Sequence, residues 1–214
     1  MYERYQLILQ SRQFEDIKRS FIRGRAAHAY IIEGPQGAGK RTLSRLASAL
    51  MVCREKSACL DCSGCRRALE GIHPDIHTYA SSKRISVKDM RELIEASALK
   101  PYEADYGVYI VENAHTATAE AQNCLLKTLE EPAGNSIFML LAVNAGQLLP
   151  TVRSRCRLVR MTGFSDKMIS SQLEALYPKD KRCVQAAALS GGNIGRAISL
   201  MENDGLWETA ALAD

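Results

Sequence analysis

The sequence predicts an α/β protein in which helices cover both faces of a parallel sheet, followed by a small domain made only of helices. Three observations predict this fold class. Apolar, strand-like runs alternate with helical periodicities from residue 29 to residue 161, and such alternation is typical of parallel sheets. A glycine-rich loop separates the first strand from the next helix, and only helical spacing remains after Gly163. We therefore expect two domains, residues 1–162 and residues 163–214.

The first elements lie before residue 80. Helical spacing over residues 14–23 predicts a helix, and the apolar run 29–32 predicts the first strand. Another helix is expected from Lys40, because apolar residues recur there at helical intervals: Leu43, Leu46, Ala47, Leu50 and Met51. Residues 76–79 predict the second strand.

The later elements continue the alternation. Ser86-Val87-Lys88-Asp89 resembles a capping box, in which the serine and the acid cap each other's backbone N–H groups, and it predicts the start of a helix. A helix ended by Pro132 and a bend through Pro150 are expected further on. The sequence predicts three more strands, over residues 108–111, 137–143 and 158–161.

Three short amphipathic stretches follow Gly163, and Pro178 and the Gly191-Gly192 pair separate them. Their apolar residues have helical spacing: Leu173 and Leu176, then Val184, Ala188 and Leu189, then Ile194, Ala197, Ile198 and Met201. We interpret residues 163–214 as a small helical lid.

Four of the seven cysteines form a cluster with the spacing C-x5-C-x2-C-x2-C, at Cys53, Cys59, Cys62 and Cys65. Four thiolates without an open position are the ligand set of structural zinc, so a zinc module is expected over residues 53–65. The odd number of cysteines and the lack of an export signal argue against disulfides. The alternative is a set of reduced thiols or a lost site. His73 and His77 could substitute as ligands, but ordinary structural roles are expected for them.

The loop after the first strand runs Gly34-Pro35-Gln36-Gly37-Ala38-Gly39-Lys40-Arg41-Thr42. Gly34, Gly37, Gly39 and Lys40 are the residue types of a loop that cradles phosphate. Arg41 occupies the position where a Ser or Thr would bind Mg²⁺, and Thr42 lies about 100° further round the helix, poorly aimed at such a metal. Lys40 could neutralise a phosphate or remain as a positive charge at a helix N-terminus. We expect ATP or ADP binding to be weak or absent.

The strand over residues 108–111 ends in Glu112-Asn113, where ATP-hydrolysing proteins usually have two acids. Glu112 could still bind a metal through its carboxylate. Asn113 cannot act as a general base, a role worth about 10²–10⁴ in rate. Together with Arg41, this change predicts no useful turnover of ATP.

The composition leaves most function classes open. An apolar content of 46% supports a substantial core, whereas a net charge of +4 is too weak to identify a nucleic-acid-binding protein. No run approaches the roughly 18 apolar residues of a membrane span, and the first residues lack the apolar core of a signal peptide. We expect a cytoplasmic protein.

The order of these motifs resembles that of clamp-loader subunits of bacterial DNA polymerase III, over nearly the whole chain. The most specific matches are Leu125-Leu126-Lys127-Thr128-Leu129-Glu130-Glu131-Pro132 and Ser154-Arg155-Cys156. Within this family, the altered phosphate loop and acidic strand are most similar to the delta prime type, rather than to the ATP-hydrolysing gamma/tau type. The resemblance implies an AAA+ module with a zinc-bearing insertion, a helical lid and a collar domain. The collar is absent from these 214 residues, so we expect the N-terminal part of a longer subunit.

The resemblance also implies roles for three residues. Arg155 matches the family's arginine finger, which stabilises charge on the γ-phosphate of a neighbouring subunit; the alternative is one more basic residue in an arginine-rich turn. Asn144 is placed like the family's sensor 1, or is only a hydrogen-bonding group at a strand end. Arg196 is placed like its sensor 2, or is a surface charge of the lid.

The resemblance thus implies a non-hydrolysing stator of the clamp loader. It would lend Arg155 to an adjacent ATPase while the complex loads a sliding clamp on primer-template DNA, as a component of the DNA polymerase III holoenzyme, a nucleotidyltransferase. The implied partners are gamma/tau and delta subunits and, through the complex, the clamp and DNA. Two alternatives remain: an active gamma/tau-like ATPase that uses Glu112 as its metal ligand, and a zinc-stabilised adaptor for DNA or protein.

Overall fold

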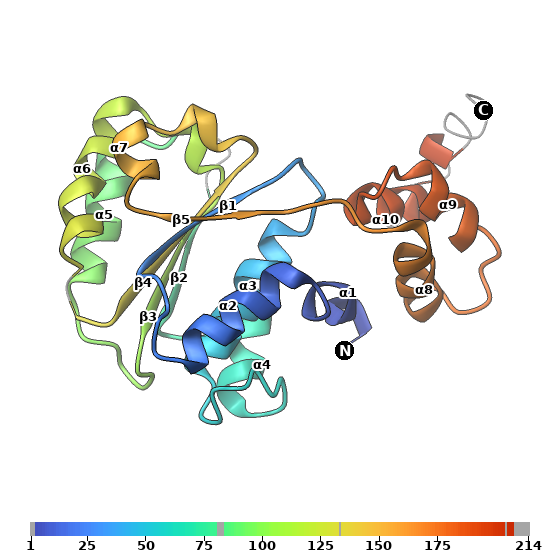
Figure 1. The fold of residues 1–214 in the computed structure, drawn as a ribbon, viewed down its shortest axis with the longest axis horizontal. Coiled ribbons are helices and arrows are strands. Elements are labelled where there is room, and N and C mark those ends of the chain that lie inside the picture. The colour runs from blue at the N-terminus through green and yellow to red at the C-terminus, as the bar shows by residue number, and fades with distance from the viewer. Residues whose placement is uncertain (1–2, 81–83, 133, 204, 208–214) are drawn as a thin grey trace.

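The computed structural model describes residues 3–80, 84–132, 134–203 and 205–207. Figure 1 shows a layered α/β part joined to a smaller group of helices. Within the described residues, five parallel strands form one sheet in the order β2-β3-β4-β1-β5. The strands are β1 (Ala29–Glu33), β2 (Ile76–Tyr79), β3 (Gly107–Val111), β4 (Ser136–Ala142) and β5 (Arg157–Arg160). The parallel sheet expected from the alternating pattern is confirmed, and the observed strand ends differ from the expected ones by no more than one residue.

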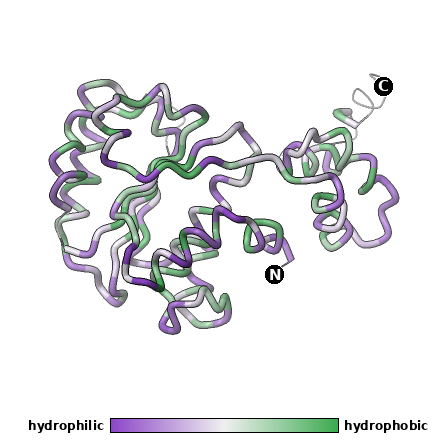
Figure 2. Tube along the Cα trace, in the orientation of Figure 1, coloured by the Kyte–Doolittle hydropathy of each residue, from purple (hydrophilic) through white to green (hydrophobic). Residues whose placement is uncertain are grey.

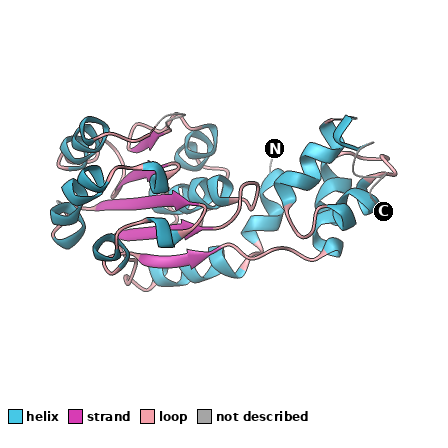
Figure 3. Cartoon of the chain, turned by 90° about the horizontal axis from the view of Figure 1, so that it is seen from above, coloured by secondary structure: helices cyan, strands magenta, loops and turns pink. Residues whose placement is uncertain are grey.

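Helices cover both faces of this sheet, as Figure 3 shows from above. One face carries α1 (Gln6–Leu9), α2 (Arg12–Ile22), α3 (Lys40–Val52) and α4 (Ser63–Glu70). The other carries α5 (Val87–Ser97), α6 (Ala119–Glu130) and α7 (Pro150–Arg153). Short 3-10 turns are η1 (Glu3–Tyr5), η2 (Ala114–Thr116) and η3 (Ala145–Gln147).

Alternate residues of each strand supply two separate cores. Tyr30 and Ile32 pack with α2 and α3, whereas Ala29 and Ile31 pack with α5 and α6, because successive side chains of a strand point to opposite faces. All four are at most 1% exposed. The central strands β1, β3 and β4 therefore read as mainly apolar runs, as buried parallel strands do, and Figure 2 shows the hydrophobic colour concentrated along the middle of the sheet.

Local sequence signals fix several helix ends. The expected capping box is present at α5, where Ser86 Oγ accepts from the Asp89 N–H at 3.3 Å and an Asp89 carboxylate oxygen accepts from the Ser86 N–H at 2.8 Å. A bend was expected at Pro150, but Pro150 is the first residue of the short helix α7. Proline fits the first turn of a helix, because its missing N–H is not needed there.

The last three helices are α8 (Asp166–Leu176), α9 (Cys183–Leu189) and α10 (Ile194–Glu202). They share a core that includes Ile169, Leu173 and Ala197, and Leu7 of α1 also packs into it. The Leu7 N–H donates to Gln172 Oε1 at 3.0 Å. The N-terminal helix therefore links the helical group to the α/β part. None of the helices in the described part has the length and apolar character of a membrane span.

Candidate functional site

The phosphate loop makes a tight turn between β1 and α3. Gly37 and Gly39 have φ angles of 81° and 91°, a left-handed region that side chains with a Cβ rarely adopt. At Gly34 the limit is space, since a Cβ there would lie 2.8 Å from Met161 Cβ. The three glycines therefore have the backbone roles that the motif implies, while nucleotide binding by them stays a prediction.

Lys40 is turned back onto its own loop. Its Nζ donates to the carbonyl oxygens of Gly34 at 2.6 Å and Pro35 at 2.8 Å. Burial, together with the positive charge of Arg41, lowers the pKa of Lys40. An incoming phosphate would have to compete with two carbonyl groups for this ammonium.

Arg41 and Glu112, far apart in sequence, form an ion pair between Nη2 and Oε2 at 2.5 Å. The Glu112 side chain is only 11% exposed, whereas that of Arg41 is 68% exposed. The guanidinium thus sits beside the carboxylate that would have to bind a metal ion. Neighbouring Asn113 is exposed and adopts a left-handed conformation as the residue before η2. Arg41, the altered position of the phosphate loop, is therefore in direct contact with the acidic residue that follows β3.

The helical group rests directly on the phosphate loop. The Gly195 N–H donates to the Gly37 carbonyl oxygen at 2.9 Å, and Asn193 Nδ2 donates to the Gln36 carbonyl oxygen at 2.8 Å. A Cβ on Gly195 would lie 2.5 Å from Gly37 Cα. Arg196 follows this contact, but its side chain is exposed and makes no hydrogen bond or ion pair within the described residues. Its predicted sensor role stays a prediction.

The remaining predicted residues have mainly local contacts. Asn144 is exposed, and its Oδ1 accepts from the Gly146 N–H at 2.7 Å to cap η3. Thr42 is half-buried. No sequence motif selects His115, whose Nδ1 is buried without a hydrogen-bond partner among the described residues. Burial, together with the positive charge of Lys40, lowers the pKa of His115.

The four cysteines of the predicted zinc module meet at the C-terminal end of α3. Their sulfur atoms all lie within 4.8 Å of one another, with Cys53 Sγ 3.7 Å from Cys59 Sγ. A tetrahedral site with Zn–S bonds of about 2.3 Å requires sulfur separations of roughly 3.8 Å. The cluster could therefore hold a metal ion, and its donor set fits zinc.

The backbone of the module is also arranged around the sulfurs. The Cys62 N–H donates to Cys59 Sγ and the Cys65 N–H donates to Cys62 Sγ, both at 3.4 Å. Ala58 and Leu60 have left-handed φ angles of 55° and 62°, which are unfavourable for residues with a Cβ. The N–H groups thus point at sulfur atoms that carry charge once a metal is bound.

The two nearby histidines have structural contacts, as expected. His73 is 4% exposed; its Nδ1 accepts from the Asp75 N–H at 3.1 Å and its Nε2 lies 3.1 Å from Glu103 Oε1. Glu103 also pairs with Arg67 of α4. His77 stacks on Tyr109, with ring centroids 5.1 Å apart.

Asp75 belongs to the same network. Its carboxylate accepts from the backbone N–H groups of Tyr102, Glu103 and Ala104. His73, Asp75 and Glu103 are close enough to be considered as metal ligands, but these hydrogen bonds already engage their oxygen and nitrogen atoms. The network instead ties α4 to the loop before β3.

Arg155 lies far from the phosphate loop. It precedes β5, and its guanidinium pairs with Glu130 at the end of α6. Since all strands are parallel, the segments before β4 and β5 lie at one edge of the sheet, and the loops after β1 and β3 lie at the other (Figure 1). A five-residue strand spans about 16 Å. The structure thus brings together the predicted phosphate-loop residues and Glu112, but not Arg155.

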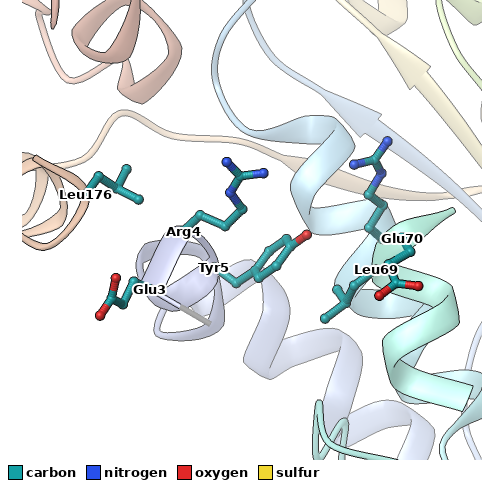
Figure 4. Close-up of a pocket in the computed structure, with 7 residues that line it drawn as sticks. Glu3, Arg4, Tyr5, Leu69, Glu70 and Leu176 are labelled. Carbon is teal, nitrogen blue, oxygen red and sulfur yellow. The ribbon is translucent and has the colours of Figure 1, made fainter. Parts of the chain in front are cut away.

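A cavity of about 570 Å³ is lined by none of these residues. It lies between the segment Glu3–Tyr5, Arg45 of α3, the end of α4 and Leu176 of α8 (Figure 4). It exposes two arginines and two glutamates, so its charges largely balance.

Comparison with known proteins gives one consistent family. The family model described as DNA polymerase III, delta subunit, matches residues 9–165. The DNA polymerase III subunit delta prime of Bacillus subtilis (strain 168) is 30% identical over 211 residues, which is 95% of this chain and 62% of that protein. The delta prime subunit of Pseudomonas aeruginosa is 35% identical over 145 residues, 64% of this chain and 44% of that protein. The chain thus spans less than two thirds of the length of these relatives.

Two solved structures are similar in fold. The DNA polymerase III gamma subunit-related protein of Thermotoga maritima has a TM-score of 0.57 at 21% identity, covering 89% of this chain and 61% of that one. The RuvB Holliday junction branch migration motor of Thermotoga maritima has a TM-score of 0.63 at 18% identity, covering 92% and 60%. At these identities the likeness shows the fold alone.

Proposed function

Because the chain belongs to the DNA polymerase III delta subunit family, with delta prime subunits among its relatives, we propose that it is a non-hydrolysing subunit of the clamp loader. In this role it supplies Arg155 to the ATP site of a neighbouring subunit during DNA replication. Its own phosphate loop serves the structure of the subunit rather than catalysis.

The first support is the state of its own phosphate site. The Arg41 guanidinium forms an ion pair with the Glu112 carboxylate at 2.5 Å, and the Lys40 ammonium donates hydrogen bonds to two carbonyl groups of the loop. Mg²⁺ would have to displace a cationic guanidinium from the Glu112 carboxylate. Asn113 lacks the basicity to activate water. Binding of ATP or ADP is therefore weak or absent, and hydrolysis does not occur.

The observation that carries the proposal is the position of Arg155. It lies at the edge of the sheet opposite its own phosphate loop, so it cannot reach a phosphate bound there. An arginine in this position, with a side chain that is 32% exposed, can serve only a phosphate bound by another molecule. A guanidinium placed there stabilises the charge that develops on the transferred phosphoryl group, an effect worth about 10³–10⁵ in rate.

We further propose that the partners are gamma/tau and delta subunits, with the sliding clamp and primer-template DNA contacted through the complex in the cytoplasm. The four-cysteine cluster binds one structural zinc ion through Cys53, Cys59, Cys62 and Cys65. Zinc stabilises the module and takes no part in the chemistry, because four thiolates leave no open coordination position.

The test is the ATPase rate of the reconstituted loader carrying Arg155→Ala in this subunit. We expect the rate stimulated by clamp and DNA to fall by the share of the adjacent site, while Arg157→Ala, an exposed arginine at the start of β5, leaves the rate close to wild type. Unchanged hydrolysis in the Arg155→Ala loader would rule out the proposed role.

A further inference from the structure

The guanidinium of Arg155 is already engaged within its own subunit. Its Nε donates to Glu130 Oε1 at 2.8 Å, and Nη2 pairs with the same oxygen. Its Nη1 donates to the Thr151 carbonyl oxygen at 2.8 Å and to Ser154 Oγ at 3.2 Å. A guanidinium has five N–H donors, so these contacts leave too few free N–H groups for a bidentate contact with a phosphate.

We propose that Glu130 is the resting partner of Arg155, a carboxylate that holds the guanidinium in the free subunit and releases it to the phosphate of a neighbouring ATP site on assembly. This inference rests on the proposed function. Glu130 is then a positioning residue, which sets how readily the arginine becomes available and does not touch the reacting atoms.

The exposure of the pair makes such an exchange feasible. The side chain of Arg155 is 32% exposed and that of Glu130 is 48% exposed, so water can solvate either partner when the pair opens. Ion pairs of this exposure change an equilibrium by up to about fivefold. A phosphate offers more negative charge than a carboxylate and matches the planar guanidinium equally well, so it is the stronger partner once it is brought near.

Release also has a second electrostatic reason. A carboxylate left beside the arginine would face the negatively charged phosphate and repel it. Removing the charge of Glu130 therefore favours phosphate binding by Arg155 in two ways. It frees the guanidinium, and it reduces the repulsion of the phosphate. The bonds from Nη1 to Thr151 and Ser154 are independent of Glu130 and keep the side chain oriented when the pair opens.

Glu131 provides a matched control. It has the same charge, follows Glu130 directly and is exposed, and its side chain makes no hydrogen bond or ion pair within the described residues. Glu130→Gln and Glu131→Gln therefore change the net charge equally, but only Glu130→Gln weakens the pair.

The first measurement is made on the subunit itself. We expect proton exchange at Arg155 Nε, followed by NMR, to be slow in the wild type, two- to fivefold faster in Glu130→Gln, and unchanged in Glu131→Gln. Equal exchange rates in all three proteins would overturn the inference whatever the loader does.

The second measurement is the ATPase rate of the reconstituted loader, with and without clamp and DNA. We expect Glu130→Gln to raise the unstimulated rate about two- to fivefold and to leave the fully stimulated rate within about twofold of wild type, with Glu131→Gln unchanged. A Glu130→Gln loader that matches Glu131→Gln, or is slower, overturns the resting role while Arg155→Ala still lowers the rate. If Arg155→Ala has no effect, the proposed function fails as well, so the two failures are distinguishable.

Discussion

The two ends of α3 carry two motifs, and the ligand-binding atoms of these motifs are arranged differently. At its C-terminal end, all four cysteine sulfurs of the zinc motif lie within 4.8 Å of one another. At its N-terminal end, the phosphate loop has its expected turn, but Lys40, Arg41 and Glu112 are bonded to groups of the protein itself. The four sulfur atoms surround a common centre. In the phosphate loop, by contrast, Lys40 contacts loop carbonyl groups and Arg41 contacts Glu112.

This difference shows why a motif does not by itself establish a function. The glycines of the loop still fix its backbone, and that backbone now supports α10 through Gly37 and Gly195. The chemistry of nucleotide hydrolysis needs charged groups that are free to bind a ligand. The following changes test whether the two ends of α3 differ in this way.

The largest effect is expected at the zinc end. Cys62→Ser removes the sulfur shared by both C-x2-C pairs, so the zinc content should fall from one ion to less than about half an ion per chain. The free energy of unfolding should fall by several kcal/mol, because metal binding and folding of such a module are coupled. Metal analysis and denaturant unfolding measure both, with Cys124→Ser, outside the cluster, as the control. Full zinc occupancy in Cys62→Ser would show that the ion is not held as described.

A smaller loss of stability is expected where the loop meets the helical group. Gly195→Ala would place a Cβ 2.5 Å from Gly37 Cα, so the contact must open, at a cost of roughly 1–3 kcal/mol. Thermal unfolding measures the effect, and Arg196→Ala on the same helix serves as an exposed control. A melting temperature equal to wild type would mean that the loop does not support α10.

Arg41→Thr tests the closed state of the nucleotide end. The change removes the cation from Glu112 and restores a hydroxyl at the position that binds Mg²⁺ in phosphate loops. We expect Mg²⁺-dependent ATP binding to strengthen by about tenfold, on the order of 1.4 kcal/mol, as measured by calorimetry. Arg45→Ala, an exposed arginine of the same helix, should bind like wild type. Equal affinity for the two variants would remove the ion pair as the reason for weak binding.

The smallest effect is expected where the zinc module joins the rest of the protein. Burial lowers the pKa of His73, although the Glu103 carboxylate opposes it. Below the ordinary histidine pKa of about 6.5, the unfolded chain therefore takes up a proton more readily than the folded one. Stability should then fall as the pH drops from 7.5 to 5.5. In His73→Asn this pH-dependent loss should be smaller, by roughly 1–3 °C in melting temperature. Parallel profiles of melting temperature against pH for the wild type and His73→Asn would contradict this prediction.

The sequence was sufficient for elements with a strong local signal. Ile76–Tyr79 and the Ser86 capping box were predicted to the residue, because a short strand-like run and a capping box involve only residues close in sequence. The short helices α1 and α4 were not predicted. The first has only four residues, and the second begins inside the cysteine cluster, where Cys62 caps it.

Local patterns could not predict the contacts between distant elements. The pairs Arg41 with Glu112 and Arg155 with Glu130, and the contact of Gly37 with Gly195, join residues from different elements. Their proximity follows from the strand order, which local periodicity does not determine. The motifs in the sequence selected these residues, and the fold determined which groups they contact.

We propose that this chain does not hydrolyse ATP although it retains a phosphate loop. The most direct test is phosphate release by the purified chain with ATP and Mg²⁺, compared with Lys40→Ala. We expect both proteins to release phosphate at the same background rate. Turnover of several ATP molecules per minute that Lys40→Ala abolishes would contradict the account.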